Sequence, residues 1–111
     1  MFNLFGPSVK SVDANQFHEL MSDGYTVIDV RTKEEFGYGH IKNAKLIDIY
    51  KSDFGDKINE LDKNGKYLVY CQSGSRSKQA VAFMNKSGID DAINLTGGIM
   101  TWHRAGKPLV K

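Results

Sequence analysis

Short apolar runs alternate along the chain with stretches in which apolar residues recur at helical spacing. The apolar and β-branched runs predict five strands, at residues 8–12, 25–30, 45–49, 67–70 and 92–95. Phe17, Leu20 and Met21 illustrate the helical spacing between the first two runs. Strands that alternate with helices through short connections are typical of an α/β fold. We therefore predict about five mostly parallel strands with helices on both faces of the sheet.

Capping patterns predict where two of the helices begin. Asp13 and Gln16 form a capping box, which predicts a helix from there to Gly24. Thr32 and Glu35 form a second capping box, which predicts a brief helical turn. This turn is predicted to run through residue 36 and to stop at the glycines 37 and 39. Three further helices are predicted over 54–61, 77–86 and 99–104.

The size and composition of the chain are those of one globular domain. Its 111 residues fit a single core, and we assign residues 8–109 to a domain and 1–7 to an irregular lead-in. The content of 41% hydrophobic and 25% charged residues is ordinary for such a protein. The apolar runs are far shorter than the ~18 residues of a membrane span. The lead-in lacks the features of a signal peptide, so we expect a cytoplasmic protein that contacts no membrane.

The charge and the cysteine content argue against nucleic-acid binding, an internal disulfide and a metal site. A net charge of +2 with scattered lysines argues against nucleic-acid binding. The single cysteine cannot form an internal disulfide, and His18, His40 and His103 lack metal-ligand spacing. We therefore expect no metal. The cysteine is then either a buried structural thiol or a reactive one.

Cys71 stands where a nucleophile would lie. It follows the apolar run 67–70 and opens a loop of small residues that leads into the helix predicted over 77–86. Amide dipoles at such a position favour the thiolate form of a cysteine. Arg76 adds a permanent positive charge that would favour the thiolate, attract an anionic substrate or lock the loop through an ion pair. An inert buried thiol is the alternative for Cys71.

A second segment is expected beside this loop. In α/β folds, ligands gather beyond the carboxyl ends of parallel strands. Asp29 and Arg31 lie at the end of one predicted strand, and Cys71 follows another. One pocket can therefore hold both segments.

Three motifs resemble those of a known family. The first, Cys71-Gln72-Ser73-Gly74-Ser75-Arg76-Ser77, resembles the active-site loop of single-domain rhodaneses, often written C-R-x-G-x-R-S. Two others resemble the flanking signatures: Val27-Ile28-Asp29-Val30-Arg31 with Glu35-Phe36 and Gly39-His40-Ile41-Lys42-Asn43-Ala44, and Leu95-Thr96-Gly97-Gly98-Ile99 with Trp102 and Gly106-Lys107-Pro108. The resemblance spans roughly residues 9 to 109. Three separated motifs in the right order are far more specific than one.

The resemblance implies a sulfurtransferase that cycles between a free thiol and a persulfide, with no metal or organic cofactor. Cys71 would take the outer sulfur from a small donor such as thiosulfate, or from a persulfide-donating protein, and pass it to cyanide or a thiol. The residues implied to hold the substrate are those of the loop and one arginine: Gln72, Ser73, Gly74, Ser75, Arg76 and Arg31.

The charged residues near the loop have structural alternatives. For Arg76 an ion pair is as reasonable as a substrate contact, and for Arg31 the alternative is an ion pair with Glu34 or Glu35. We expect Asp29 to orient N–H, hydroxyl or guanidinium groups of the loop rather than to act as a general base, because a thiolate needs none.

Two features of the loop bear on its substrate. Dual-specificity phosphatases of the same fold have five residues between cysteine and arginine, whereas four separate Cys71 from Arg76, which favours sulfur transfer over phosphatase or arsenate reductase chemistry. Gln72 stands where the family often has arginine, and this weakens the case for thiosulfate. A protein persulfide, for example on a cysteine desulfurase, is the alternative donor. The other class of function is a non-enzymatic interaction module or passive sulfur carrier.

The remaining residues have structural interpretations. We expect His40 to pack and form hydrogen bonds rather than to pair with Cys71, and we expect His18 and His103 on the surface. Trp102 is expected to cover the edge of the sheet. The paired glycines 97 and 98 are expected to form a tight turn.

Overall fold

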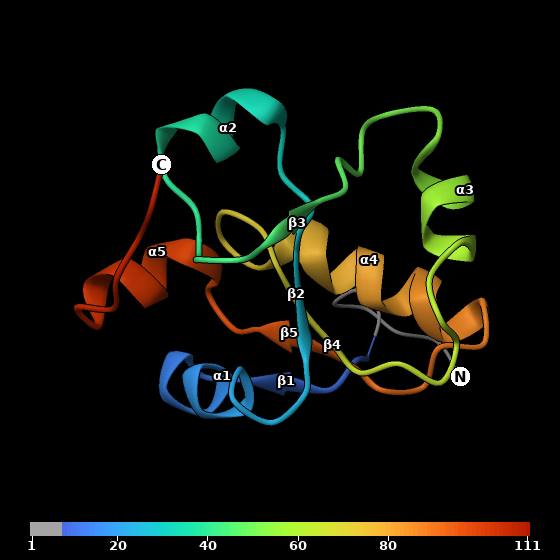
Figure 1. The fold of residues 1–111 in the computed structure, drawn as a ribbon, viewed down its shortest axis with the longest axis horizontal. Helices are drawn as coiled ribbons and strands as arrows, with labels where there is room; N and C mark the ends of the chain where they lie inside the picture. Colours follow the sequence, from blue (N-terminus) through green and yellow to red (C-terminus); the bar gives the residue numbers. More distant parts are fainter. Residues whose placement is uncertain (1–7) are drawn as a thin grey trace.

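A computed structural model describes residues 8–111, which form an α/β fold around a five-stranded parallel sheet (Figure 1). The strands are β1 (Ser11–Val12), β2 (Thr26–Asp29), β3 (Lys45–Leu46), β4 (Tyr67–Tyr70) and β5 (Ala92–Leu95). Their order in the sheet is β1-β5-β4-β2-β3, and every neighbouring pair is parallel. The predicted fold class is confirmed. The predicted lead-in, residues 1–7, lies outside the described residues.

The helices follow the capping patterns of the sequence. Their bounds are α1 (Ala14–Leu20), α2 (Lys33–Tyr38), α3 (Phe54–Asn59), α4 (Ser75–Lys86) and α5 (Gly98–Arg104). Asp13 with Gln16 and Thr32 with Glu35 both form complete capping boxes, as predicted. The prediction that the glycines 37 and 39 stop α2 is confirmed for Gly39, which is the C-cap, and is wrong for Gly37, because this exposed glycine is accommodated inside the helix.

Other boundaries differ from the prediction for physical reasons. The edge strands β1 and β3 are much shorter than the apolar runs that predicted them, because each has a strand partner on one side alone. Residues 21–24 form turns rather than continuing α1. Helix α4 begins two residues earlier than predicted, since Gly74 adopts φ 100° and turns the chain directly into the helix.

Two layers of helices cover the sheet. Alternate residues of β4 point to opposite faces, so Leu68 and Tyr70 pack with α1 and α5, while Tyr67 and Val69 pack with α3 and α4. Helices on both faces confirm the prediction. Trp102, however, is buried on the face with α1 rather than at the sheet edge, with its ring centroid 5.9 Å from that of Phe17.

The sheet register brings the two predicted site segments together. Asp29 of β2 lies opposite Tyr70 of β4 in the parallel ladder, so the residues that follow these strands leave the sheet side by side. Figure 1 shows α2 above and α5 to the left of the loop that follows β4. Between residues 8 and 111, no helix has the length and apolar character needed to cross a membrane.

Candidate active site

Cys71 follows β4 directly and its sulfur is enclosed by the loop that precedes α4. The residue is 1% exposed. The Gly74 N–H donates a hydrogen bond to Sγ at 3.1 Å, and the Ser77 hydroxyl oxygen lies 3.3 Å from Sγ. The first turn of α4 therefore lies against the sulfur, where the helix dipole favours negative charge. A thiol with these neighbours can serve as a nucleophile.

Helix α5 holds the loop from its other side. The Ile99 N–H donates to the Cys71 carbonyl at 2.9 Å, and the Met100 N–H donates to the Gln72 carbonyl at 3.2 Å. A side chain at Gly98 would overlap both of these carbonyl groups. The paired glycines thus form the expected turn at the start of α5, and they also allow α5 to approach the loop backbone closely.

Arg76 forms an ion pair rather than facing the substrate space with a free guanidinium. Its Nη1 and Nη2 atoms each donate to one oxygen of Glu35 at 2.8 Å. The Thr32 N–H and hydroxyl also donate to Glu35, and the guanidinium lies over the Tyr50 ring. Hydrogen bonding to Arg76 lowers the pKa of Glu35 to about 2, and the pKa of Arg76 is raised in turn. The structure therefore contains the ion pair that was one alternative for Arg76.

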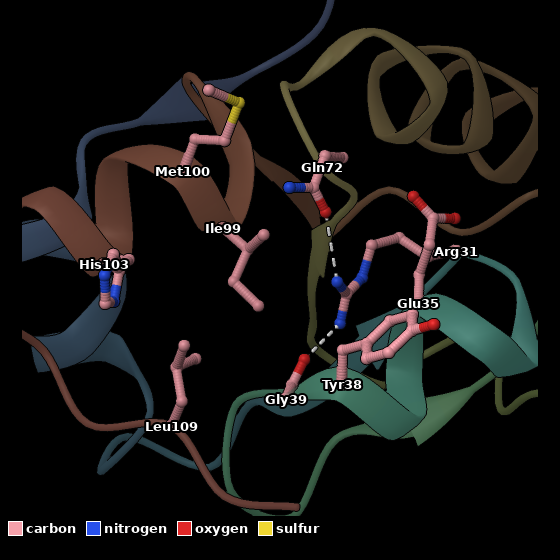
Figure 2. Close-up of a pocket in the computed structure, with 9 residues that line it drawn as sticks. All are labelled: Arg31, Glu35, Tyr38, Gly39, Gln72, Ile99, Met100, His103 and Leu109. Atoms are coloured by element: carbon pink, nitrogen blue, oxygen red, sulfur yellow. Dashed lines mark hydrogen bonds between the residues drawn. The ribbon is translucent and has the colours of Figure 1, made fainter.

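Arg31 is buried beside the loop and fully engaged (Figure 2). Asp29 accepts hydrogen bonds from its Nε at 3.0 Å and its Nη2 at 2.8 Å, and the Gly39 carbonyl accepts another from Nη2 at 2.7 Å. Nη1 donates to the Gln72 side-chain oxygen at 3.1 Å. Burial by itself would lower the pKa of Arg31, but Asp29 outweighs it and the pKa is raised. The alternative of an ion pair with Glu34 or Glu35 is wrong in its partner, because Arg31 pairs with Asp29.

Asp29 acts on the loop through Arg31. It is fully buried, and it also accepts a hydrogen bond from the Arg31 backbone N–H at 2.9 Å. The guanidinium that it holds lies over the ring of Tyr70, 5.6 Å from the centroid, and reaches Gln72. Burial and the negative charge of Asp29 raise the pKa of Tyr70, so this phenol stays neutral.

A cavity of about 480 Å³ opens beside the loop. Its wall combines the polar side chains Arg31, Glu35, Gln72 and His103 with the apolar or aromatic side chains Tyr38, Ile99, Met100 and Leu109. Figure 2 shows these side chains arranged around a common space between α2, α5 and the C-terminal segment. Gln72, the neighbour of Cys71, is the loop residue that lines it. The cavity is large enough for an organic group larger than an inorganic ion.

Two residues close to the sulfur were not among the predicted site residues. Ser77 and Asn94 are buried, and the Ser77 hydroxyl lies 2.6 Å from the Asn94 side-chain oxygen. The sequence contained a signal for Asn94, which is a polar residue within the apolar run of β5. Ser77 closes the Cys71 motif, so its position in the sequence also pointed to the site.

The other predicted residues lie as follows. Ser73 and Ser75 are exposed on the loop and at the start of α4. His40 stacks on Phe36 and its Nδ1 lies 3.0 Å from the Phe36 carbonyl oxygen, which fits the expected packing role. His18 and His103 are exposed, as predicted. In the described part of the chain, no three histidine, cysteine or acidic side chains gather as metal ligands.

The arrangement can support nucleophilic chemistry at sulfur without a strong anion-binding site. Cys71 has an N–H donor and a helix N-terminus at its sulfur. Arg31 and Arg76, the two guanidinium groups next to the loop, each face a carboxylate, so their positive charge is compensated. The site therefore offers little net positive charge to a doubly charged anion.

Comparisons with known proteins agree with this geometry. Residues 13–105 match the rhodanese-like domain family. The chain is 32% identical to a sulfurtransferase of Allochromatium vinosum over 92% of this chain and 95% of that one, and 30% identical to a thiosulfate sulfurtransferase of Ectopseudomonas mendocina over 84% of each. The crystal structure of a rhodanese-related protein from Thermoplasma volcanium is similar with a TM-score of 0.83 and 35% identity, covering 92% of this chain and 98% of that one.

Proposed function

Because the chain belongs to the rhodanese-like family of sulfurtransferases, we propose that it transfers a sulfane sulfur through a persulfide formed on Cys71. The observation that carries this proposal is the position of Sγ, which accepts a hydrogen bond from the Gly74 N–H within a loop of four residues between Cys71 and Arg76. We expect a loop of this length to enclose a sulfur atom and its persulfide extension. The Gly74 N–H, with other amides of the loop, would hold the negatively charged outer sulfur.

The reaction has two displacement steps. The Cys71 thiolate attacks the outer sulfur of the donor, the bond between the two donor sulfurs breaks, and the donor leaves as a thiolate, or as sulfite if it was thiosulfate. An acceptor thiolate or cyanide then attacks the outer sulfur of the Cys71 persulfide, and Cys71 leaves as a thiolate. No net oxidation occurs, and the cysteine is the carrier between the steps.

Charge at the site supports an organic persulfide as the better donor and thiosulfate as the poorer one. Gln72 is neutral and is already bonded to Arg31. Arg31 and Arg76 are both paired with carboxylates, so a thiosulfate dianion would gain little from either. The cavity next to Gln72 offers Ile99 and Met100 to an organic group instead. A persulfide on a small thiol or on a protein cysteine fits this lining.

Intact mass spectrometry tests the proposal directly. The protein is incubated with thiosulfate or with a cysteine persulfide, and Cys71→Ser serves as the control. We expect a mass increase of one sulfur atom in the native protein and none in the variant, with the sulfur lost again on addition of cyanide or a thiol. No mass increase with either donor would overturn the proposal. Hydrolysis of an aryl phosphate that depends on Cys71 would instead establish phosphatase chemistry.

A further inference from the structure

A chain of buried polar groups, outside the lining of the cavity, leads away from the sulfur. The Ser77 hydroxyl oxygen lies 3.3 Å from Cys71 Sγ and 2.6 Å from the Asn94 oxygen Oδ1. Asn94 Nδ2 in turn donates to the Ser11 hydroxyl oxygen at 3.2 Å. Ser77 is 0% and Asn94 is 3% exposed, so water does not compete for these groups.

The Ser77 hydroxyl has one hydrogen and two neighbours that could accept it. The 2.6 Å separation from Asn94 Oδ1 is that of a strong O–H···O hydrogen bond, whereas the sulfur at 3.3 Å is a weaker acceptor while it carries its proton. The contact of Nδ2 with Ser11 directs Oδ1 toward Ser77. The Ser77 O–H therefore donates its hydrogen bond to Asn94 Oδ1, and a lone pair of the Ser77 oxygen faces the sulfur.

We propose that Asn94 is a positioning residue that favours the protonated form of Cys71. When Cys71 is a thiol, its S–H can donate to Ser77, and Ser77 can donate to Asn94, so each group has a partner. When Cys71 becomes a thiolate, Ser77 must turn its hydrogen toward the sulfur. The buried Oδ1 of Asn94 then has no donor, and an unsatisfied buried carbonyl oxygen is unfavourable.

This effect opposes the other groups around the sulfur. The first turn of α4 and the Gly74 N–H favour the thiolate. The nearby charges are two ion pairs, Arg76 with Glu35 from α2 and Arg31 with Asp29 from β2, and from α5 the imidazole of His103 lines the cavity. The helix N-terminus, the Gly74 N–H, both ion pairs and His103 all remain in a variant of Asn94, which lies on β5. A change in the titration of Cys71 in such a variant therefore reports on the contact with Ser77.

The ultraviolet absorbance of the thiolate, followed against pH, tests this proposal in the free protein, with Cys71→Ser as the blank. Replacement of Asn94 by leucine, which has a similar volume and no acceptor, releases the Ser77 hydrogen to the sulfur. We expect the titration midpoint to fall by about one pH unit, which corresponds to about 1.4 kcal/mol. Asn94→Ala is a second variant with the same expectation, and thermal melting confirms that each variant is folded.

A double variant identifies the route of the effect. In a protein that already carries Ser77→Ala, Asn94→Leu should leave the midpoint unchanged, because the group that connects Asn94 to the sulfur is absent. An unchanged or higher midpoint in folded Asn94→Leu and Asn94→Ala would overturn the proposal, since the Asn94 amide would then be neutral toward the thiolate or support it. An equal fall with and without Ser77 would also overturn it. No sulfur donor is used, so failure here is separate from failure of the persulfide experiment.

Discussion

The two ion pairs beside the active-site loop have the same chemistry and opposite surroundings. Arg31 and Asp29 are two residues apart in the sequence, and their side chains are 4% and 0% exposed. Arg76 and Glu35 are 41 residues apart, and their side chains are 20% and 29% exposed. The first pair joins residues that are close in the sequence, and it is buried. The second pair connects α4 to α2 at the surface of the protein.

Because the two ion pairs differ in burial, we expect them to differ in how much they contribute to stability. A buried pair cannot lose one partner without leaving an uncompensated charge, so the Arg31 pair fixes Gln72 in place. A partly exposed pair is weaker and depends on pH and salt, so we expect the Arg76 pair to contribute less to stability than the Arg31 pair. Both pairs compensate the positive charge of the arginines near Cys71, so the site offers an anion little net positive charge.

Asp29→Asn removes the negative charge from the buried pair. The Arg31 guanidinium stays buried without a counter-charge, so we expect a loss of about 3–5 kcal/mol in the free energy of unfolding, measured by urea denaturation. Asp90→Asn, at an exposed aspartate, is the control and should change stability by less than about 0.5 kcal/mol. A loss below about 1 kcal/mol in Asp29→Asn would mean that the two pairs do not differ in the way proposed.

Glu35→Gln removes the negative charge from the exposed pair, and its effect depends on pH. The pKa of Glu35 is about 2 in the folded protein against 4.5 ordinarily, so its stabilisation is complete above about pH 4.5 and is lost as the pH falls toward 2. We expect Glu35→Gln to cost roughly 1–2 kcal/mol at pH 7, after allowance for solvent screening. Denaturation midpoints at pH 7, 4 and 2.5 measure the difference.

The control for that experiment is the neighbouring Glu34→Gln, because Glu34 is exposed on the same helix. The denaturation midpoint of Glu34→Gln should equal that of the native protein at each pH. The stability of Glu35→Gln should converge with that of the native protein toward pH 2, since protonation removes the same charge in both. A gap that stays constant from pH 7 to pH 2.5 would contradict the assignment to Glu35.

Gln72→Arg adds a positive charge that neither pair can neutralise. Asp29 and Glu35 are already engaged by their own arginines, so the new guanidinium remains available to an anion. We expect the KM for thiosulfate, a dianion, to fall about threefold to tenfold, equivalent to about 0.7–1.4 kcal/mol, and the KM for an organic persulfide, which carries less negative charge, to fall less. An unchanged or higher KM for thiosulfate would show that the missing charge at residue 72 does not limit this donor.

Much of the fold was predictable because it depends on local patterns. The capping boxes at Asp13 and Thr32 fixed the starts of α1 and α2, and the buried runs of β2, β4 and β5 identified the central strands. The edge strands were overestimated because strand length at an edge depends on pairing with one neighbour, which an apolar run does not encode. The position of Cys71 at the end of β4 was predictable from the order of strand, loop and helix.

The partners within the site were less predictable, because they depend on distances between segments that are far apart in the sequence. The sequence offered Arg31 three nearby carboxylates, and burial at the end of β2 selected Asp29. Asn94 reaches Ser77 because α4 packs on β5, a contact that the strand pattern does not specify. The sequence identified Glu35 as a capping residue, but its ion pair with Arg76, which is 41 residues away, is visible only in the structure.

The close approach of α5 to the loop limits which residues position 98 can hold. At Gly98 a methyl group would meet backbone atoms of Cys71 and Gln72, which cannot move aside without moving Cys71. At Gly37 on α2 a methyl group would meet nothing within 4 Å. The two glycines therefore differ in the substitutions that they tolerate. We expect position 37 to accept ordinary helical residues, and we expect any side chain at position 98 to displace the backbone around Cys71.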